Sequence, residues 1–178
     1  MNTSAKSNRT DAIELLTADH RAVEKLFDAW QPADKADEDA RYTLVKRACE
    51  MLTVHTMIEE ELLYPAAAKA LPENTLDVDE AFVEHYLVKS LIQRFTTLTP
   101  ADAGFDATFR VLTELVQHHV KEEEEDLFPQ LRKSGLNLEQ LGQRMAERKA
   151  ELDAKLDAAG VRSTGDRTMT LSHRDFPV

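Results

Sequence analysis

Residues 55–65 read HTMIEEELLYP, and residues 119–129 read HVKEEEEDLFP. In both stretches a histidine is followed four residues later by a glutamate, and then by an aromatic residue and a proline; the two copies lie 64 positions apart. Side chains four residues apart lie on the same face of an α-helix. Each stretch therefore predicts a helix that directs one histidine and one glutamate the same way.

A second pair of histidines extends the repeat. His20 precedes Val23 by three residues, and His85 precedes Val88 by three, 65 positions later. Both histidines lie on apolar stripes with helical spacing. Each half of the chain therefore supplies one helix with a single inward histidine and one helix with the pattern His-x-x-x-Glu.

Apolar residues recur at helical spacing along most of the chain, which predicts an all-α fold. We expect helices at about 10–30, 37–71, 78–98, 102–132 and 138–158. The first four, joined by short turns, predict an up-down-up-down four-helix bundle at residues 10–135, with an additional C-terminal helix and tail at 136–178 and a disordered segment at 1–9. Pro65 must kink or end the second helix, because proline has no N–H and crowds the preceding turn.

Composition limits the possible partners and compartment. The chain has 178 residues, of which 42% are hydrophobic and 31% charged, as in one soluble globular domain. A net charge of −11 argues against nucleic acid or an anionic membrane surface as partner. The chain has no apolar run of membrane-spanning length and no apolar signal segment, and its one cysteine, Cys49, is expected to be buried and inert. These features favour the cytoplasm; the oligomeric state stays open.

The repeated histidines and glutamates predict a metal centre on the bundle axis. Its candidate ligands are His20, His55, Glu59, His85, His119 and Glu123. Two metal ions, each with two imidazoles and a share of both carboxylates, fit this set, and an oxide or hydroxide bridge would complete them. A single histidine on an apolar stripe is more often an ordinary core residue, but four without a cation would each need a hydrogen-bond partner. Imidazole suits several metals, and manganese or a mixed iron–manganese centre also fits.

The order His, His-x-x-x-Glu, His, His-x-x-x-Glu, with trailing LYP and LFP, resembles the hemerythrin-like, or HHE cation-binding, family over residues 10–133. The resemblance implies two iron ions with an oxo or hydroxo bridge. It makes His20, His55, His85 and His119 terminal ligands, and Glu59 and Glu123 bridging ones. Oxygen-carrying hemerythrins of marine invertebrates have a second histidine where this chain has Lys89, and an aspartate where it has Glu123. The chain is closer to the bacterial members, which are connected with oxygen, nitric oxide or peroxide responses and with iron handling.

Other polar residues carry weaker expectations. Glu24 is a possible further ligand, His118 a helix-boundary residue with a small chance of ligation, and Asp19 a surface acid that could instead orient an imidazole. We expect solvated side chains at Glu60, Glu61, Glu122, Glu124 and Glu125, and a free side chain at His173 in the tail. Tyr64 and Phe128 are expected to plug the bundle end below the metals.

Three functions remain open at this point. The first is binding or sensing of dioxygen or a related small oxidant, since the imidazole-rich set offers no obvious acid or base for substrate chemistry. The second is an enzyme that removes peroxide or nitric oxide at a more open metal ion. The third is an iron-handling stress protein. Ferritin-like Glu-x-x-His pairs, a His-Glu-x-x-His motif and phosphate-binding glycine loops are all missing from the sequence.

Overall fold

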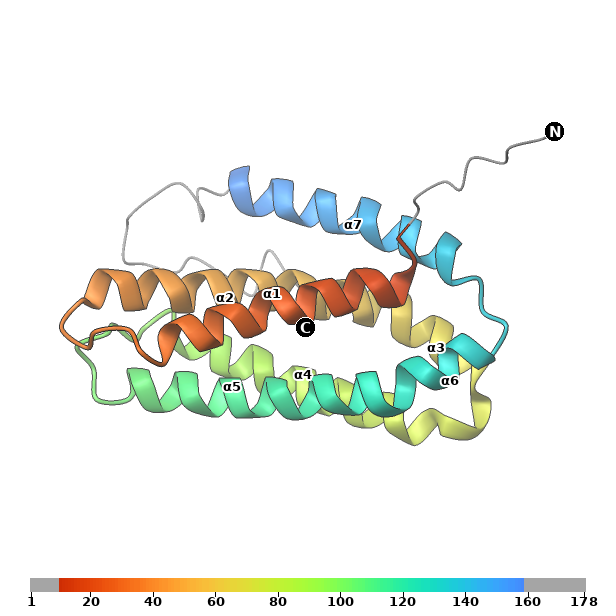
Figure 1. The fold of residues 1–178 in the computed structure, drawn as a ribbon, viewed down its shortest axis with the longest axis horizontal. Coiled ribbons are helices and arrows are strands. Elements are labelled where there is room, and N and C mark those ends of the chain that lie inside the picture. The colour runs from red at the N-terminus through yellow and green to blue at the C-terminus, as the bar shows by residue number, and fades with distance from the viewer. Residues whose placement is uncertain (1–9, 159–178) are drawn as a thin grey trace.

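The computed structural model describes residues 10–158, apart from the side chains of residues 74–77, and this part of the chain is helical without a strand (Figure 1). The elements are α1 (Ala12–Trp30), α2 (Glu38–Ile58), η1 (Glu59–Leu63), α3 (Tyr64–Ala70), η2 (Pro72–Asn74), α4 (Thr75–Arg94), α5 (Phe105–Glu122), η3 (Glu123–Leu127), α6 (Phe128–Lys133) and α7 (Leu138–Ala158). The all-α bundle with an additional C-terminal helix is confirmed. The predicted tail beyond residue 158 and the segment 1–9 lie outside the described residues.

Helix ends follow local capping chemistry. The Asp11 carboxylate accepts from the Glu14 N–H at 2.9 Å, and the Glu14 carboxylate accepts from the Asp11 N–H at 3.0 Å, which closes a capping box at the start of α1. Asp102 does not begin a helix as expected. Its carboxylate accepts from the N–H and the hydroxyl of Thr99 at 2.7 and 2.9 Å, so it closes a turn, and α5 starts at Phe105.

The chain stays helical on both sides of Pro65, without a non-helical residue between α2 and α3. The five residues before Tyr64, Glu59–Leu63, form a π-helical turn, and Glu123–Leu127 form the equivalent turn before Phe128 and Pro129. The Tyr64 N–H donates to the carbonyl of Glu59, five residues back. This shift to a wider turn accommodates a proline that lacks an N–H, so the chain continues as α3. Short π-helical segments occur often at functional sites.

An aromatic cluster fills the end of the bundle that holds the α1–α2 and α4–α5 connections (Figure 1). Phe109 lies at its middle, with ring centroids 5.6 Å from Phe27, 4.9 Å from Trp30 and 6.2 Å from Phe95. Edge-to-face contacts of this kind contribute beyond the burial of apolar area. The rigid packing at this end holds the four long helices in register.

The two sides of the bundle are covered differently. Helix α7 packs on α1, α2 and η1, and lies on the side away from α4 and α5 (Figure 1). Its buried face consists of Leu141, Gly142, Met145, Leu152 and Leu156. Arg148 pairs with Glu61 at 2.7 Å, and Lys149 pairs with Asp19 of α1. Helix α7 therefore closes one face of the bundle with both apolar and ionic contacts.

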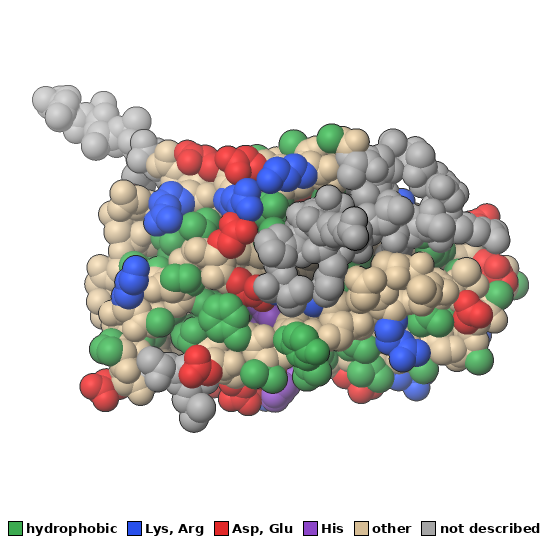
Figure 2. Space-filling view, turned by 180° about the vertical axis from the view of Figure 1, so that it is seen from behind, with side chains coloured by type: hydrophobic (Ala, Val, Ile, Leu, Met, Phe, Trp, Pro, Cys, Tyr) green, Lys and Arg blue, Asp and Glu red, His purple; other side chains and the backbone are tan. Residues whose placement is uncertain are grey.

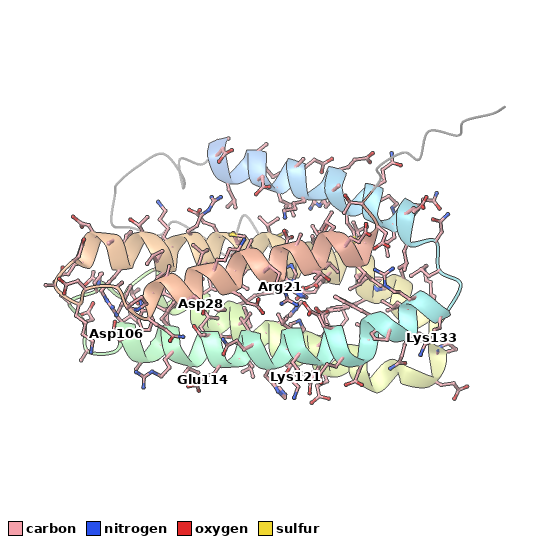
Figure 3. The ribbon with its side chains drawn as sticks, viewed as in Figure 1. Arg21, Asp28, Asp106, Glu114, Lys121 and Lys133 are labelled. Atoms are coloured by element: carbon pink, nitrogen blue, oxygen red, sulfur yellow. The ribbon has the colours of Figure 1, made fainter. Side chains whose placement is uncertain are left out.

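The outer surface carries most of the charge. Glu114 and Lys121 point away from the bundle on α5 (Figure 3). None of the described helices is both long and apolar enough to cross a membrane. The boundaries predicted for the bundle, at residues 10 and 135, stay a prediction.

Candidate metal centre

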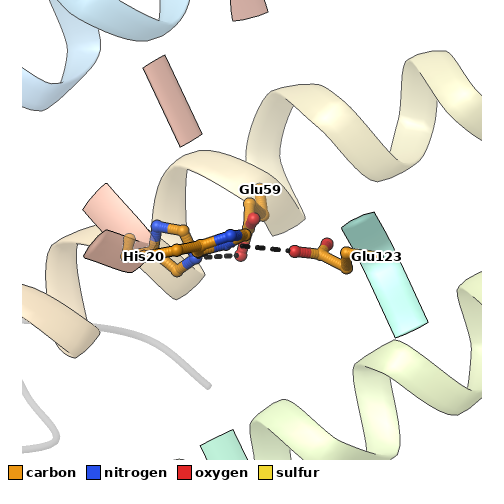
Figure 4. A group of neighbouring side chains, drawn as sticks. His20, Glu59 and Glu123 are labelled. Carbon is orange, nitrogen blue, oxygen red and sulfur yellow. Dashed lines mark hydrogen bonds and ion pairs between the residues drawn. The ribbon is translucent and has the colours of Figure 1, made fainter. Parts of the chain in front are cut away.

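The structure brings the six predicted ligand residues together in the middle of the bundle. His20 lies on α1, His55 on α2, His85 on α4 and His119 on α5, while Glu59 and Glu123 are the first residues of the two π-helical turns. All six are at most 5% exposed. His20, Glu59 and Glu123 point toward one another from three separate segments (Figure 4).

The histidines form two close pairs, each with its Nε2 atoms inward. The Nε2 atoms of His20 and His55 are 3.2 Å apart, and those of His85 and His119 are 3.1 Å apart. Glu59 Oε2 lies between the pairs, 3.2 Å from His55 Nε2 and 3.4 Å from His85 Nε2. Glu59 therefore contacts one histidine of each pair.

Glu123 occupies the second position between the pairs. Its Oε2 is 3.3 Å from His20 Nε2 and 3.8 Å from His119 Nε2. The potential ligand atoms fall into two overlapping groups, each within 4.8 Å: one of His20, His55, Glu59 and Glu123, and one of Glu59, His85 and His119. The geometry matches two adjacent sites that share carboxylates.

Each inward histidine has a carboxylate behind it, and the four pairs form a ring around the bundle. His20 Nδ1 lies 2.8 Å from Glu124, His85 Nδ1 3.0 Å from Glu60, His119 Nδ1 2.7 Å from Glu84, and His55 Nδ1 3.8 Å from Asp19. His55, His85 and His119 thus each have a carboxylate from an earlier segment of the bundle, and Glu124 of η3 closes the ring onto α1. Such outer partners fix the orientation and tautomer of a ligand histidine.

Three of these acids correct the sequence predictions. Glu60 and Glu124, expected to be solvated, contact His85 and His20 instead. Asp19, expected at the surface, is buried between His55 and Lys149. The signal that could have found Asp19 and Glu84 is their shared place, one residue before the single histidine of each half.

The inward atoms fit divalent metal ions. Because an ionised carboxylate only accepts hydrogen bonds, the Nδ1 atoms bonded to Glu124, Glu60 and Glu84 carry a proton. In their neutral form these imidazoles present the lone pair of Nε2 inward. Both oxygens of Glu59 and Oε2 of Glu123 are buried without a hydrogen-bond partner. Facing lone pairs and unsatisfied buried carboxylate oxygens are costly unless a cation lies among them.

The electrostatics of the cluster lead to the same conclusion. Burial and the neighbouring Glu123 carboxylate raise the pKa of Glu59 well above its usual range. Burial opposes ionisation of Glu123 too, but His119 and His20 lower the pKa of Glu123 to about 2. Burial lowers the pKa of His55 to about 4. Ionising both carboxylates is therefore opposed by their mutual repulsion, and bound metal ions would supply the compensating charge.

The aromatic residues of the two motifs differ at the centre. The Tyr64 hydroxyl donates to Glu123 Oε1 at 3.1 Å and lies 3.2 Å from His85 Nε2. Phe128, its counterpart, stacks on the His20 ring with centroids 5.9 Å apart. Tyr64 therefore lies beside the candidate ligands, and does not only plug the end of the bundle. Burial and the adjacent carboxylates raise its pKa, so the hydroxyl keeps its proton.

The remaining candidates lie apart from the six. Glu24 pairs with Arg21, which also pairs with Glu124. His118 is 60% exposed and lies 3.1 Å from Glu122. Cys49 is buried as expected, and burial raises the pKa of its thiol. His173 lies outside the described residues.

A small chamber adjoins all four histidines. Its volume is about 10 Å³, close to that of a single water-sized molecule. Apart from the histidines it is lined by Asp19, Val23, Leu52, Thr56, Val88, Val116 and Val120. Val23 and Val88 occupy the same position in the two halves of the repeat. The chamber can hold only a very small molecule next to the candidate ligands.

Fold and site place the chain among helical-bundle proteins with a candidate metal centre of histidine and glutamate. The sequence profile described as hemerythrin HHE cation binding domain matches residues 11–131, so the chain belongs to this family. A crystal structure of a hemerythrin HHE cation-binding domain-containing protein from Mycobacterium kansasii shares the fold, with a TM-score of 0.72, 24% identity, and coverage of 88% of this chain and 94% of that one.

A curated relative differs in length. The chain is 29% identical over 152 residues to a protein from Nostoc sp. strain PCC 7120 named DNA nickase. The alignment covers 85% of this chain and 42% of the relative. The chain therefore spans less than half the length of that relative, whose name describes the longer protein.

Proposed function

We propose that the chain is a non-haem di-iron protein that binds dioxygen or a related small oxidant, as an oxygen-binding or sensing protein of the cytoplasm. The observation that carries the proposal is the chamber of about 10 Å³ against four imidazoles. Besides the histidines, Asp19 and Thr56, its lining is valine and leucine, and its size leaves no room for an organic substrate.

The chain's own residues would divide the work at this centre. His20, His55, His85 and His119 would hold the ions, and Glu59 and Glu123 would bridge them. When bound, two ferrous ions supply two electrons for a small oxidant. Glu60, Glu84 and Glu124 keep the imidazoles oriented, and the buried position of all six residues excludes bulk water.

Tyr64 favours a second candidate function, which is removal of peroxide or nitric oxide. Reduction of peroxide to water requires protons at the reacting oxygen atoms. The Tyr64 hydroxyl keeps its proton and lies within 3.4 Å of His85 and His119. The same hydroxyl also donates to Glu123, so it contacts three of the candidate ligands.

Elemental analysis of the full chain is the first test. We expect about two irons per chain, with charge-transfer bands in the visible spectrum. Two manganese ions, or one ion of each metal, would overturn the iron assignment and keep the site. Absence of bound metal after anaerobic addition of Fe²⁺ would overturn the proposed function.

Rapid mixing then separates the functions. Reduced protein mixed with dissolved oxygen should form a stable adduct that decays when oxygen is removed. Consumption of peroxide or nitric oxide in large excess over protein would support the enzyme instead. If neither occurs, iron handling is the function that remains.

A further inference from the structure

An acidic pocket lies beside the candidate centre on the side that α7 leaves uncovered. Its volume is about 310 Å³, and it lies between α4 and the α5–η3–α6 segment. Five carboxylates line it: Glu80, Glu84, Glu122, Glu123 and Asp126. The other lining residues are Ala81, His119, Leu127 and Gln130, with neither lysine nor arginine among them.

The pocket reaches two of the six candidate ligands. His119 and Glu123 both line it, and Glu123 is 3% exposed with a buried Oε2 that lacks a hydrogen-bond partner. The pocket thus extends from the exposed residues Glu80 and Asp126 to two residues of the buried centre, His119 and Glu123. Acidic and histidine side chains lie together among apolar ones on the face seen in Figure 2.

Three further polar side chains lie between the centre and the rim of the pocket, which consists of the exposed acids Glu80 and Asp126. Glu84, His118 and Glu122 have potential ligand atoms within 4.8 Å of one another. Glu84 faces both ways: its Oε1 is 3.8 Å from His118 Nε2 at the surface, and its Oε2 is 2.7 Å from His119 Nδ1 behind the centre. A series of carboxylate and imidazole groups therefore leads from the surface to the candidate ligands.

At the matching place in the first half of the repeat, the described residues are apolar instead of acidic. Leu15, Ile58, Leu62 and Ala66 stand where the second half has Glu80, Glu122, Asp126 and Gln130. Ile58 is fully buried, and the other three pack partly buried against the core. A groove of about 620 Å³ borders Leu62 and Ala66, but its lining includes none of the six candidate ligands.

Lys149 supplies a further contrast. In the first half Asp19, the counterpart of Glu84, pairs with the Lys149 ammonium of α7. A fixed positive charge thus lies against the acid of the covered half. In the uncovered half the matching acid lies in an open pocket among other carboxylates.

We propose that this acidic pocket is the entrance through which divalent metal cations reach the buried centre. The inference rests on the proposed function, since it needs a centre that binds metal. Clustered negative charge in a cleft concentrates cations and speeds their arrival, by about 10- to 1000-fold in favourable cases. A neutral oxidant gains nothing from such charge, and an anion is repelled, so the chemistry selects a cation.

The test is the rate at which the full-length apo protein takes up Fe²⁺ under argon, measured by rapid mixing and chelator quench. Glu80→Gln with Asp126→Gln removes two rim charges without touching a candidate ligand. We expect uptake to slow about tenfold or more at low salt, with the final metal content unchanged. Added salt should slow uptake by the original protein more than by the variant.

A matched control separates local from overall charge. Asp28→Asn with Glu114→Gln neutralises two exposed acids away from the pocket (Figure 3), changing the net charge equally, and should leave the uptake rate near that of the original protein. Glu80→Leu with Asp126→Leu, which imitates Leu15 and Leu62 of the first half, should slow uptake at least as much as the glutamine variant.

The possible results separate failure of the proposed entrance from failure of the proposed function. Unchanged uptake in the rim variants, or equal slowing in the control, overturns the entrance. A lower final metal content in the glutamine variant would make the rim acids part of the site and also overturn it. If the original protein takes up no metal, the proposed function fails. If metal-loaded variants react with hydrogen peroxide as fast as the original protein does, the pocket serves cations and not the oxidant.

Discussion

The two halves of the bundle supply the same candidate ligands in different surroundings. Each gives one lone histidine and one His-x-x-x-Glu pair, and each histidine has a carboxylate behind it. In the first half α7 covers the outer face, and apolar residues lie beneath it. In the second half the same positions are acidic and open to a pocket. The two halves thus share the candidate ligands and differ in the residues that surround them.

The difference also reaches the centre itself. Tyr64 places a hydroxyl beside His85, His119 and Glu123, whereas Phe128 places an apolar ring against His20. One candidate metal position therefore has a proton donor beside it and the other has a hydrophobic wall. Matching ligand sets do not make the two positions chemically equivalent.

The largest effect is expected from removing a carboxylate that lies between the two halves. Glu59→Ala or Glu123→Ala should reduce bound metal from about two ions per chain to about one or none, because each serves both halves. His118→Ala, outside the two groups, should keep its metal. Metal analysis after anaerobic loading measures this. If His118→Ala empties the site while Glu59→Ala does not, the ligand assignment is wrong.

Substitution of one leucine on each side compares how strongly the covered and uncovered sides contribute to stability. Leu152 of α7 is 1% exposed, and Leu87 of α4 is 45% exposed. Leu152→Ala should lower the free energy of unfolding by about 2–4 kcal/mol, since it empties a packed position. Leu87→Ala should change it by less than about 0.5 kcal/mol. Urea denaturation of both variants checks the pair, and equal losses would mean that α7 does not pack as described.

A glycine sharpens the same contrast at the start of α7. A Cβ at Gly142 would lie 2.6 Å from the backbone nitrogen of Ala12 and 2.8 Å from the carbonyl oxygen of Thr10, where only backbone could yield. Gly142→Ala should therefore lower the free energy of unfolding by about 1–3 kcal/mol. Gly104→Ala, whose nearest neighbour is a side-chain atom at 3.8 Å, is the control and should shift it by less than about 0.5 kcal/mol.

The smallest expected effect comes from making the two motifs alike. Tyr64→Phe removes the hydroxyl that donates to Glu123, which should lower the free energy of unfolding of the apo protein by about 1 kcal/mol. Metal content should stay at about two ions per chain. If the protein consumes peroxide, its rate should fall in this variant. Loss of metal would instead make the phenol a ligand.

Much of this arrangement could be predicted from local pattern. Helical periodicity places the five helices, and the spacing of four residues puts each His-x-x-x-Glu pair on one face. The π-helical turns cannot be predicted from the sequence, because a proline inside a helix fits a kink, an end or a wider turn equally well. The prediction that Glu60 and Glu124 are solvated is wrong. Each follows a candidate ligand by one residue and so points about 100° away from it on a helix.

The helices, the repeat and the six inward polar residues follow from the amino-acid order, because they depend on spacings within one helix. Which acid lies behind which histidine depends on packing between helices, since each such pair joins two different segments. The same packing also decided that α7 covers one half and leaves acids around a pocket on the other. Periodicity says which face of a helix turns inward, and only the packing of the whole chain determines what that face meets.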